Sequence, residues 1–170
     1  MKVAGPSKNL RQLDESVLYS HLYLIYLLFV CGFMKFEEIA EKVKKLGLPT
    51  GKYALFGSVP LSAHSIRESN DADIIATQDV YDALKAKGWN EKIYPDGRKM
   101  LDSDCFEVGA EWTYGSYNPD PARLIAEAET IEGVPVVMLE EVLKWKKAFG
   151  REKDLRDVKL IEAYMKRETE

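Results

Sequence analysis

The chain has 170 residues, of which 46% are hydrophobic and 31% are charged, so it can form one core but not several domains of ordinary size. A formal net charge of -4 argues against a broad nucleic-acid surface and against DNA groove reading, because both need clustered Lys and Arg. The two cysteines form no CxxC pair, which argues against a zinc site or a disulfide framework and fits the reducing cytoplasm.

An apolar segment at residues 22–34 stands apart from the rest of the chain. It is shorter than the roughly 20 residues that cross a bilayer as a helix, so a membrane anchor is not favoured, although it stays an alternative. Asp14 and Glu15 interrupt the basic region that a signal peptide needs. Because Met34 opens directly into an amphipathic pattern, we treat residues 34–170 as one domain. Residues 1–33 are an apolar N-terminal extension, which either lies upstream of the true start or is an anchor.

The first elements of that domain follow one another closely. Apolar residues at three- and four-residue spacing predict a surface helix over residues 36–47. Residues 53–56 form a short apolar run that is typical of a buried strand and breaks at Gly57-Ser58. A proline then suits the first turn of a helix, which we expect over residues 60–67. Residues 71–77 predict a second strand directly behind that helix.

The middle of the chain alternates between extended and helical patterns. Residues 80–87 predict a helix that ends at a glycine. A turn at residues 95–98 separates two extended segments, and the second contains a strand over residues 105–112. A turn at residues 119–121 precedes a short helix, and residues 134–137 predict a further strand. Two C-terminal helices follow, and the second is expected to bury an apolar stripe made of Leu155, Val158, Ile161 and Met165.

Two short motifs carry the chemistry. A strand that ends in Gly57-Ser58 and leads into a helix presents unpaired N–H groups and a hydroxyl, which suit a phosphate, although such a pair alone is more often a plain turn. Asp71 and Asp73 share one face of a strand, because side chains alternate along it. Convergent carboxylates favour Mg²⁺, with Mn²⁺ as a substitute, since hard cations bridge carboxylates and phosphates. The alternative is a strand end with solvated acids.

A third acid on a neighbouring strand would complete a two-metal clamp. Alternation over residues 105–112 places Glu107 and Glu111 on the face opposite Phe106. We nominate Glu107, which lies nearer the strand middle, and keep Glu111 in reserve. Asp104 is a poorer candidate because it would share the face of Phe106, unless a β-bulge reverses the assignment. Glu107 is expected to activate an attacking hydroxyl, as a metal ligand or as a general base.

These residues resemble the active-site pattern of the nucleotidyltransferase-fold superfamily, which includes polymerase-beta-like enzymes and minimal nucleotidyltransferases. The pattern consists of Gly57, Ser58, Arg67, Asp71, Asp73 and Glu107. Residues 150–157 resemble a helix-entry motif of small members, so the similarity spans roughly residue 34 to the C-terminus. The resemblance implies an α+β (α/β) fold with a small mixed β-sheet flanked by helices and with C-terminal helices. It also implies Mg²⁺ at Asp71, Asp73 and Glu107.

The residues expected to bind the nucleotide are Gly57, Ser58, Arg67 and Lys153. Arg67 is expected to neutralise a triphosphate, with pairing to Glu68 or to helix carbonyls as an equal alternative. We interpret most of the basic residues near the C-terminus as a solvated helix face. Lys153 is the exception, because it falls in the motif that resembles the superfamily.

We therefore expect a cytoplasmic, Mg²⁺-dependent nucleotidyltransferase that moves a nucleoside monophosphate from an NTP, such as ATP, to an unidentified acceptor. The acceptor is a protein, an RNA or a small molecule. The alternative is a non-catalytic nucleotide-binding module or an antitoxin-type partner protein of a toxin. The third acid is Glu where Asp is more usual in the superfamily, which moves the carboxyl outward by about one methylene and makes turnover the open question.

Overall fold

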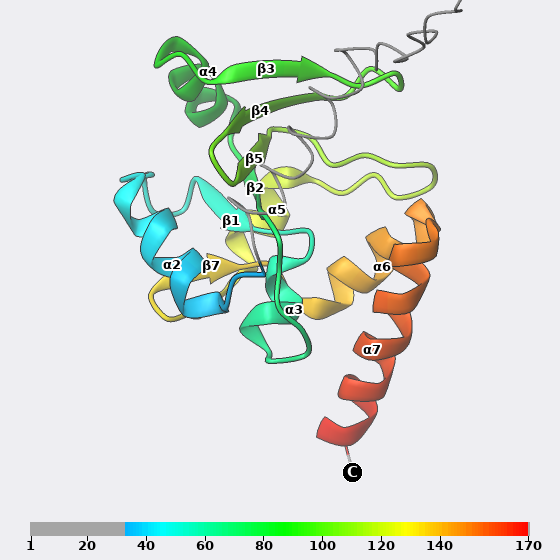
Figure 1. Ribbon diagram of the computed structural model, residues 1–170. Coiled ribbons are helices and arrows are strands. Elements are labelled where there is room, and N and C mark those ends of the chain that lie inside the picture. Colours follow the sequence, from blue (N-terminus) through cyan, green and yellow to red (C-terminus); the bar gives the residue numbers. More distant parts are fainter. Residues whose placement is uncertain (1–32, 170) are drawn as a thin grey trace, which may run out of the picture. The chain divides into compact units, whose positions relative to one another are not determined.

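The computed structural model of the chain describes residues 33–169 and has one seven-stranded mixed sheet, in the order β3-β4-β5-β2-β1-β7-β6 (Figure 1). The strands are β1 (Tyr53–Leu55), β2 (Ala72–Ala76), β3 (Asn90–Ile93), β4 (Lys99–Ser103), β5 (Phe106–Gly109), β6 (Glu129–Ile131) and β7 (Val134–Val136). The helices are α2 (Phe36–Lys45), α3 (Val59–Ala63), α4 (Gln78–Ala86), α5 (Pro121–Ala126), α6 (Leu139–Phe149) and α7 (Glu152–Glu168). The predicted α+β fold, with a mixed sheet flanked by helices, is confirmed.

The centre of the sheet brings the two predicted motifs together. Strand β2 pairs antiparallel with β1 and parallel with β5, while β1 also pairs parallel with β7. Because β1 and β2 run in opposite directions, the end of β1 lies beside the start of β2. The backbone N–H of Phe56 donates a hydrogen bond of 2.8 Å to the carbonyl of Asp73. Gly57-Ser58 therefore follows β1 at the level of the acids on β2.

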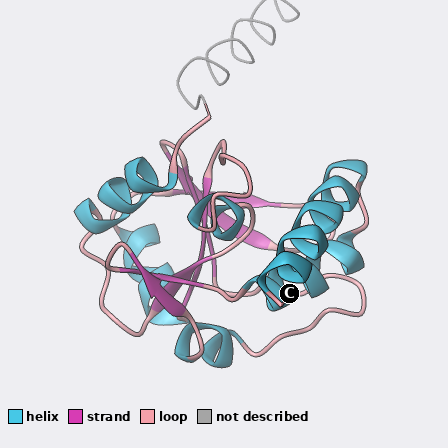
Figure 2. Cartoon of the chain, turned by 90° about the horizontal axis from the view of Figure 1, so that it is seen from below, coloured by secondary structure: helices cyan, strands magenta, loops and turns pink. Residues whose placement is uncertain are grey.

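Helices lie on both sides of the sheet, as the view from below in Figure 2 shows. The junction between the sheet and α6 is an aromatic cluster of Phe56, Trp112 and Trp145. The ring centroid of Phe56 lies 4.8 Å from that of Trp112 and 5.2 Å from that of Trp145. All three side chains are buried, so the cluster adds a large apolar area to the core. The cluster fixes α6 next to the end of β1.

The apolar N-terminal extension predicted for residues 1–33 lies outside the described residues, apart from Phe33. Within the described part, no helix is both long enough and apolar enough to cross a bilayer. Met34 is buried and exchanges two backbone hydrogen bonds with Ser69, of 2.7 and 3.2 Å. The chain just before α2 is thereby tied to the turn that precedes the acids of β2.

The secondary structure differs from the prediction at one helix end and in one additional strand. Helix α3 ends at Ala63 instead of near Arg67, because Ser65 adopts a φ of 56°, which a right-handed helix cannot continue. Strand β6 was not predicted at all. It has only three residues, which is too short for a readable alternation of apolar and polar side chains, and its place in the sheet depends on pairing with β7.

The predicted apolar stripe of α7 is also partly wrong. Val158 and Ile161 are buried as expected, but the side chain of Leu155 is 48% exposed. Two aspartates, Asp154 and Asp157, take the buried face in the first two turns of the helix. Burial of carboxylates requires ionic partners, and those partners come from other elements described below. The helical periodicity was right, but it assigned the wrong residues to the core.

Candidate functional site

Asp71 and Asp73 line a cavity of about 530 Å³ between the sheet and the C-terminal helices. Asp71 precedes the strand and is exposed, whereas Asp73 lies within it and is half-buried. Ser58 lines the same cavity. The other charged side chains of the wall are mostly basic: Arg67, Lys146, Arg151, Lys153, Arg156 and Asp157. Five of the predicted residues thus line one cavity, although Lys153 is far from the others in the sequence: Ser58, Arg67, Asp71, Asp73 and Lys153.

Gly57 allows the carboxyl group of Asp73 to approach the backbone. Its φ is 63°, in the left-handed region, and a Cβ at this position would lie 2.6 Å from Asp73 Cγ and closer still to Oδ2. Only glycine meets both requirements at once. Among the described residues, no acceptor takes the backbone N–H groups of Gly57 and Ser58. The backbone at Gly57 therefore approaches the carboxylate of Asp73, and two amide donors without an acceptor among the described residues lie at this turn.

The hydroxyl of Ser58 belongs to a short polar chain beside the acids. Ser58 Oγ shares a hydrogen bond with Ser69 Oγ. The hydroxyl of Ser69 in turn donates a hydrogen bond of 2.8 Å to the backbone carbonyl of Asp71. Since Ser69 is fully buried, this chain fixes the turn before β2 relative to Ser58.

Glu107 lies directly beside Asp73. The parallel pairing of β2 with β5 places the two residues in register, so their side chains share one face of the sheet. The carboxylate of Glu107 accepts a hydrogen bond from the hydroxyl of Tyr94 and does not line the cavity that contains Asp73. Asp104 has a φ of 55°, is exposed and lies 3.6 Å from Lys42 Nζ.

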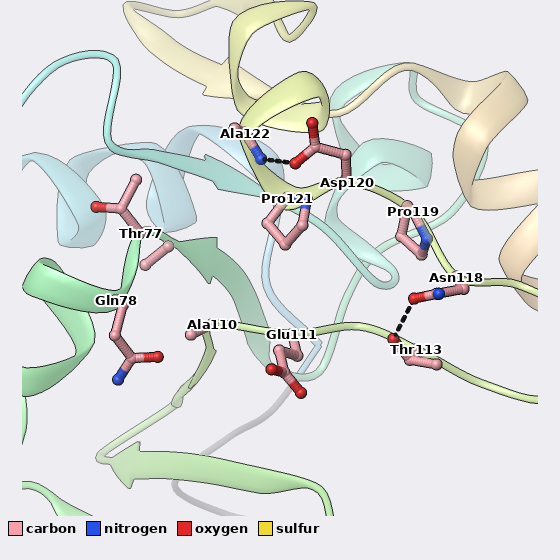
Figure 3. A pocket seen from close by; sticks show the side chains of 11 residues that line it. Thr77, Gln78, Ala110, Glu111, Thr113, Asn118, Pro119, Asp120, Pro121 and Ala122 are labelled. Atoms are coloured by element: carbon pink, nitrogen blue, oxygen red, sulfur yellow. Dashed lines mark hydrogen bonds between the residues drawn. The ribbon is translucent and has the colours of Figure 1, made fainter.

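Glu111, the reserve candidate, lines a different cavity of about 550 Å³ (Figure 3). This second cavity lies where β2 leads into α4 and where the chain leaves β5, and Thr77, Gln78 and Asn118 contribute to its wall. It contains neither Asp71 nor Asp73. The structure thus brings Glu107, and not Glu111, next to the acid pair.

The acids of the site repel one another. Burial raises the pKa of Asp73 well above its ordinary value, and the charges of Asp71 and Glu107 raise it further. The positive charges of Lys146 and Lys153 only partly offset this rise in pKa. A site that holds three mutually repelling carboxylates is destabilising unless a cation or a proton compensates them. Such groups are found more often at functional sites than elsewhere.

Lys153 and Arg67 differ in their freedom to bind a ligand. Lys153 is exposed, lines the cavity and has no ion-pair partner among the described residues. The guanidinium group of Arg67 donates two hydrogen bonds of 2.7 Å to Asp157 and one of 2.7 Å to the carbonyl of Glu68. The contact with Glu68 is thus to its backbone carbonyl, and the ion-pair partner of Arg67 is Asp157. Most of the donors of Arg67 are engaged within the protein.

A partly buried charge network, which was not predicted from the sequence, forms part of the cavity wall. Its members are Arg67, Lys146, Arg151, Asp154 and Asp157. Lys146 Nζ lies 2.8 Å from Asp157 and 3.5 Å from Asp154, and its side chain is only 4% exposed. Arg151 closes the network through two hydrogen bonds to Asp154, of 2.6 and 3.1 Å. The position of Lys146 in the sequence of α6 did not indicate that it would be buried. The interpretation of the basic residues near the C-terminus as a solvated helix face is therefore wrong for Lys146.

The network joins the turn after α3 to both C-terminal helices. Burial alone would raise the pKa of Asp157, but hydrogen bonds from Arg67 and Lys146 outweigh it, and the pKa is lowered. The ionised pair therefore stabilises the fold above the ordinary aspartate pKa of 3.8, and this stabilisation is lost as pH falls through the lowered value.

Replacement of Arg67 by Lys should lower the free energy of unfolding by about 1–2 kcal/mol, because Lys cannot form the bidentate pair with Asp157. Urea denaturation at pH 7 measures the loss, and the difference from the wild type should shrink below pH 4. Arg156→Lys is the matched control, since the pair of Arg156 with Glu152 is exposed. Equal stability of the two variants at pH 7 would contradict a structural role for the ion pair between Arg67 and Asp157.

The donor set suits a metal ion that arrives together with phosphates. Within residues 33–169, no three His, Cys, Asp or Glu side chains are arranged as a metal site. Two carboxylates, Asp71 and Asp73, do line one cavity. Mg²⁺ commonly takes one or two protein carboxylates, and substrate phosphates and water complete its shell. The mutual repulsion at Asp73 also fits a divalent cation.

Comparisons of this chain with protein-family models, with curated proteins and with solved structures give no match.

Proposed function

We propose that the chain is a Mg²⁺-dependent nucleotidyltransferase of the cytoplasm, which transfers a nucleoside monophosphate from an NTP to a hydroxyl or similar acceptor. One observation carries the proposal. A single cavity is lined by two carboxylates, Asp71 and Asp73, and by basic side chains that include Lys153, which has no ion-pair partner within residues 33–169. A ligand that matches both sides combines a divalent cation with several phosphates, which is the description of a metal-bound NTP.

Each residue has a role that its position supports. The amides of Gly57 and Ser58 donate hydrogen bonds to phosphate oxygens, while the hydroxyl of Ser58 holds the turn through Ser69. Lys153 neutralises the phosphates from the opposite wall of the cavity. Asp71 and Asp73 would hold Mg²⁺. When bound, the ion supplies charge neutralisation at the phosphate under attack and at the leaving pyrophosphate.

The proposed reaction forms one bond at the α-phosphorus and breaks one. The acceptor oxygen forms a bond to the α-phosphorus, the bond from that phosphorus to the β-phosphate bridging oxygen breaks, and pyrophosphate leaves. The proton of the acceptor hydroxyl passes to a carboxylate, and Glu107 is our candidate because it lies beside Asp73. The acceptor is a protein, an RNA or a small molecule.

One observation favours a second function, namely nucleotide binding without turnover. Glu107 does not line the cavity. A chain with this arrangement keeps the pocket for the metal-nucleotide complex and lacks the third acid for chemistry. Such a protein would act as a nucleotide-binding module, or as an antitoxin-type partner whose state depends on the nucleotide.

Incubation of the purified chain with each NTP labelled at the α-phosphate, with Mg²⁺ or Mn²⁺ and cell extract, separates the two functions. Label transferred to protein, RNA or a small molecule supports the nucleotidyltransferase. Tight binding of an NTP without pyrophosphate release supports the binding module. If no NTP binds in the presence of either metal, both functions are excluded.

Lys153→Ala should raise the dissociation constant of the Mg²⁺–NTP complex about tenfold, because one phosphate-facing cation is lost at a partly screened position. Isothermal titration calorimetry measures the affinity. Lys159→Ala is the matched control, since Lys159 is an exposed lysine of the same helix and does not line the cavity. Equal affinities of the two variants would remove Lys153 from the site.

A further inference from the structure

Glu107 occupies the middle of a row of three acids on neighbouring strands. The register pairs Asp102 of β4 with Glu107 of β5, and Glu107 with Asp73 of β2. Residues paired in this way lie on the same face of a sheet, with Cβ atoms about 4.5–5.5 Å apart. Like charges at that spacing repel, so a glutamate in the middle of the row is pushed away from both neighbours.

Asp102, the acid at the end of the row away from Asp73, has its own partners. Asp102 lies 2.8 Å from Lys92 Nζ and accepts a hydrogen bond of 2.9 Å from Asn90. Glu107 has no ion-pair partner among the described residues, and its side chain has three rotatable bonds. Another group must therefore hold its carboxylate beside Asp73.

That group is Tyr94, whose hydroxyl donates a hydrogen bond to Glu107 Oε1. Tyr94 comes from the turn between β3 and β4, and the backbone closes this turn by two hydrogen bonds of 2.9 Å, from Tyr94 to Arg98 and from Gly97 to Tyr94. Burial raises the pKa of Tyr94, and the hydrogen bond to Glu107 raises it further, so the phenol remains a donor at neutral pH. Within the described part of the chain, Oε1 is the carboxylate oxygen of Glu107 that is engaged, and Oε2 remains for a ligand.

Arg98 fixes the ring of Tyr94. Its guanidinium carbon lies 4.9 Å from the ring centroid of Tyr94, and 5.6 Å from the ring centroids of both Tyr114 and Phe149. Arg98 Nε also donates a hydrogen bond of 2.7 Å to Asp96. The position of the Tyr94 hydroxyl thus depends on contacts with the loop after β5 and with the end of α6.

We propose that Tyr94 is a positioning residue, which keeps the carboxylate of Glu107 beside that of Asp73 and thereby strengthens divalent-cation binding at the acids. This inference rests on the proposed function and deepens it. Tyr94 acts through Glu107 and does not touch the substrate. A third negative charge held near Asp73 increases the affinity of the site for a dication, and an oriented carboxylate is better placed to take the acceptor's proton.

Tyr94→Phe tests the inference, because it removes the hydroxyl and keeps the ring against Arg98. The probe is Mn²⁺, titrated by electron paramagnetic resonance with adenosine 5′-[α,β-methylene]triphosphate present, which cannot release pyrophosphate. We expect the dissociation constant of Mn²⁺ to rise about tenfold and the metal-free affinity for the analogue to stay unchanged. In the transfer assay, kcat should fall about tenfold or more without a change in KM for the NTP.

The matched control is Tyr81→Phe. Tyr81 also donates its hydroxyl to a glutamate, Glu91, at 2.9 Å, but neither residue lines the cavity of the acids. A double-mutant cycle with Glu107→Gln adds specificity. If Tyr94 acts through Glu107, the double variant should bind Mn²⁺ no more weakly than Glu107→Gln alone.

The outcomes are distinguishable. If the wild type binds Mn²⁺ with the analogue and Tyr94→Phe binds it equally well or more tightly, the inference about Tyr94 is overturned and the proposed function stands. Additive losses in the cycle overturn the inference too, because Tyr94 would then act independently of Glu107. If the wild type does not bind Mn²⁺ with the analogue, the proposed function fails and this inference fails with it.

Discussion

Replacement of Asp73 by Asn is expected to abolish nucleotide transfer while making the folded chain more stable at neutral pH. Loss of activity follows because Asn lacks the charge that would hold Mg²⁺ in the cavity. Metal charge stabilisation is worth several kcal/mol, so the rate should fall by at least about 10³-fold. The assay is transfer of label from the α-phosphate of an NTP, and wild-type turnover in Asp73→Asn would exclude Asp73 from the site.

The gain in stability follows from the direction of the pKa shift. Burial and the charges of Asp71 and Glu107 raise the pKa of Asp73 in the folded chain, so the folded state loses stability as pH rises from 3.8 through the raised value. The amide of Asp73→Asn carries no charge at any of these pH values. Its melting temperature should therefore exceed that of the wild type at pH 7, and the difference should disappear in acid.

Asp79→Asn is a control of opposite sign. A hydrogen bond from Lys52 lowers the pKa of Asp79 to about 2, so its ionised form stabilises the fold and this stabilisation is lost only as pH falls toward 2. Asp79→Asn should accordingly not be more stable than the wild type at pH 7. A melting temperature of Asp73→Asn below that of the wild type would show that the acids of the site do not repel one another in the folded protein.

Gly57→Ala is expected to lower the free energy of unfolding by about 3 kcal/mol and to prevent nucleotide binding. Two effects add: a left-handed backbone costs alanine about 1–2 kcal/mol, and the new methyl group overlaps the carboxyl of Asp73, which costs about 1–3 kcal/mol. The displaced carboxyl could no longer share the cavity with Asp71. Urea denaturation and titration with Mg²⁺ and an NTP measure the two losses.

The chain offers a matched control for the backbone effect alone. Gly47 has the same φ of 63° as Gly57, and a Cβ at Gly47 would meet nothing within 4 Å. Gly47→Ala should therefore cost only about 1–2 kcal/mol. The double variant Gly57→Ala with Asp73→Ala removes the overlap and should recover stability to about the level of Gly47→Ala. Equal losses in Gly57→Ala and Gly47→Ala would mean that Asp73 does not pack against Gly57.

Local patterns predicted the parts of the site that depend on one strand at a time. The apolar run before Gly57-Ser58 ended a strand as expected, whereas the strand predicted over residues 71–77 begins at Ala72, so Asp71 precedes it and Asp73 lies within it. Alternation in the later strand favoured Glu107 over Asp104, and the register of β2 with β5 places Glu107 beside Asp73. These predictions work because the two-residue period of a strand is a property of the backbone, independent of its neighbours.

Contacts across the chain decided the rest. Periodicity assigned Leu155 to the core and left Asp154 and Asp157 outside, whereas the structure buries the aspartates against Lys146, Arg67 and Arg151. Arg67 looked free to bind phosphate, but Asp157, ninety residues away, takes its donors. A charged residue can be buried only where a distant partner compensates it, and hydrophobic patterning contains no information about that partner.

The amino-acid sequence by itself determined the strands at the centre of the site and favoured Glu107 over Asp104 as the acid beside Asp73. Tertiary structure decided which donors stay available: it commits Arg67 to Asp157, gives Lys153 no ion-pair partner among residues 33–169, and places Tyr94 on Glu107. The physical reason is one of range. Backbone geometry acts between neighbouring residues, while the energy of a buried charge depends on every group that the fold brings within a few ångströms.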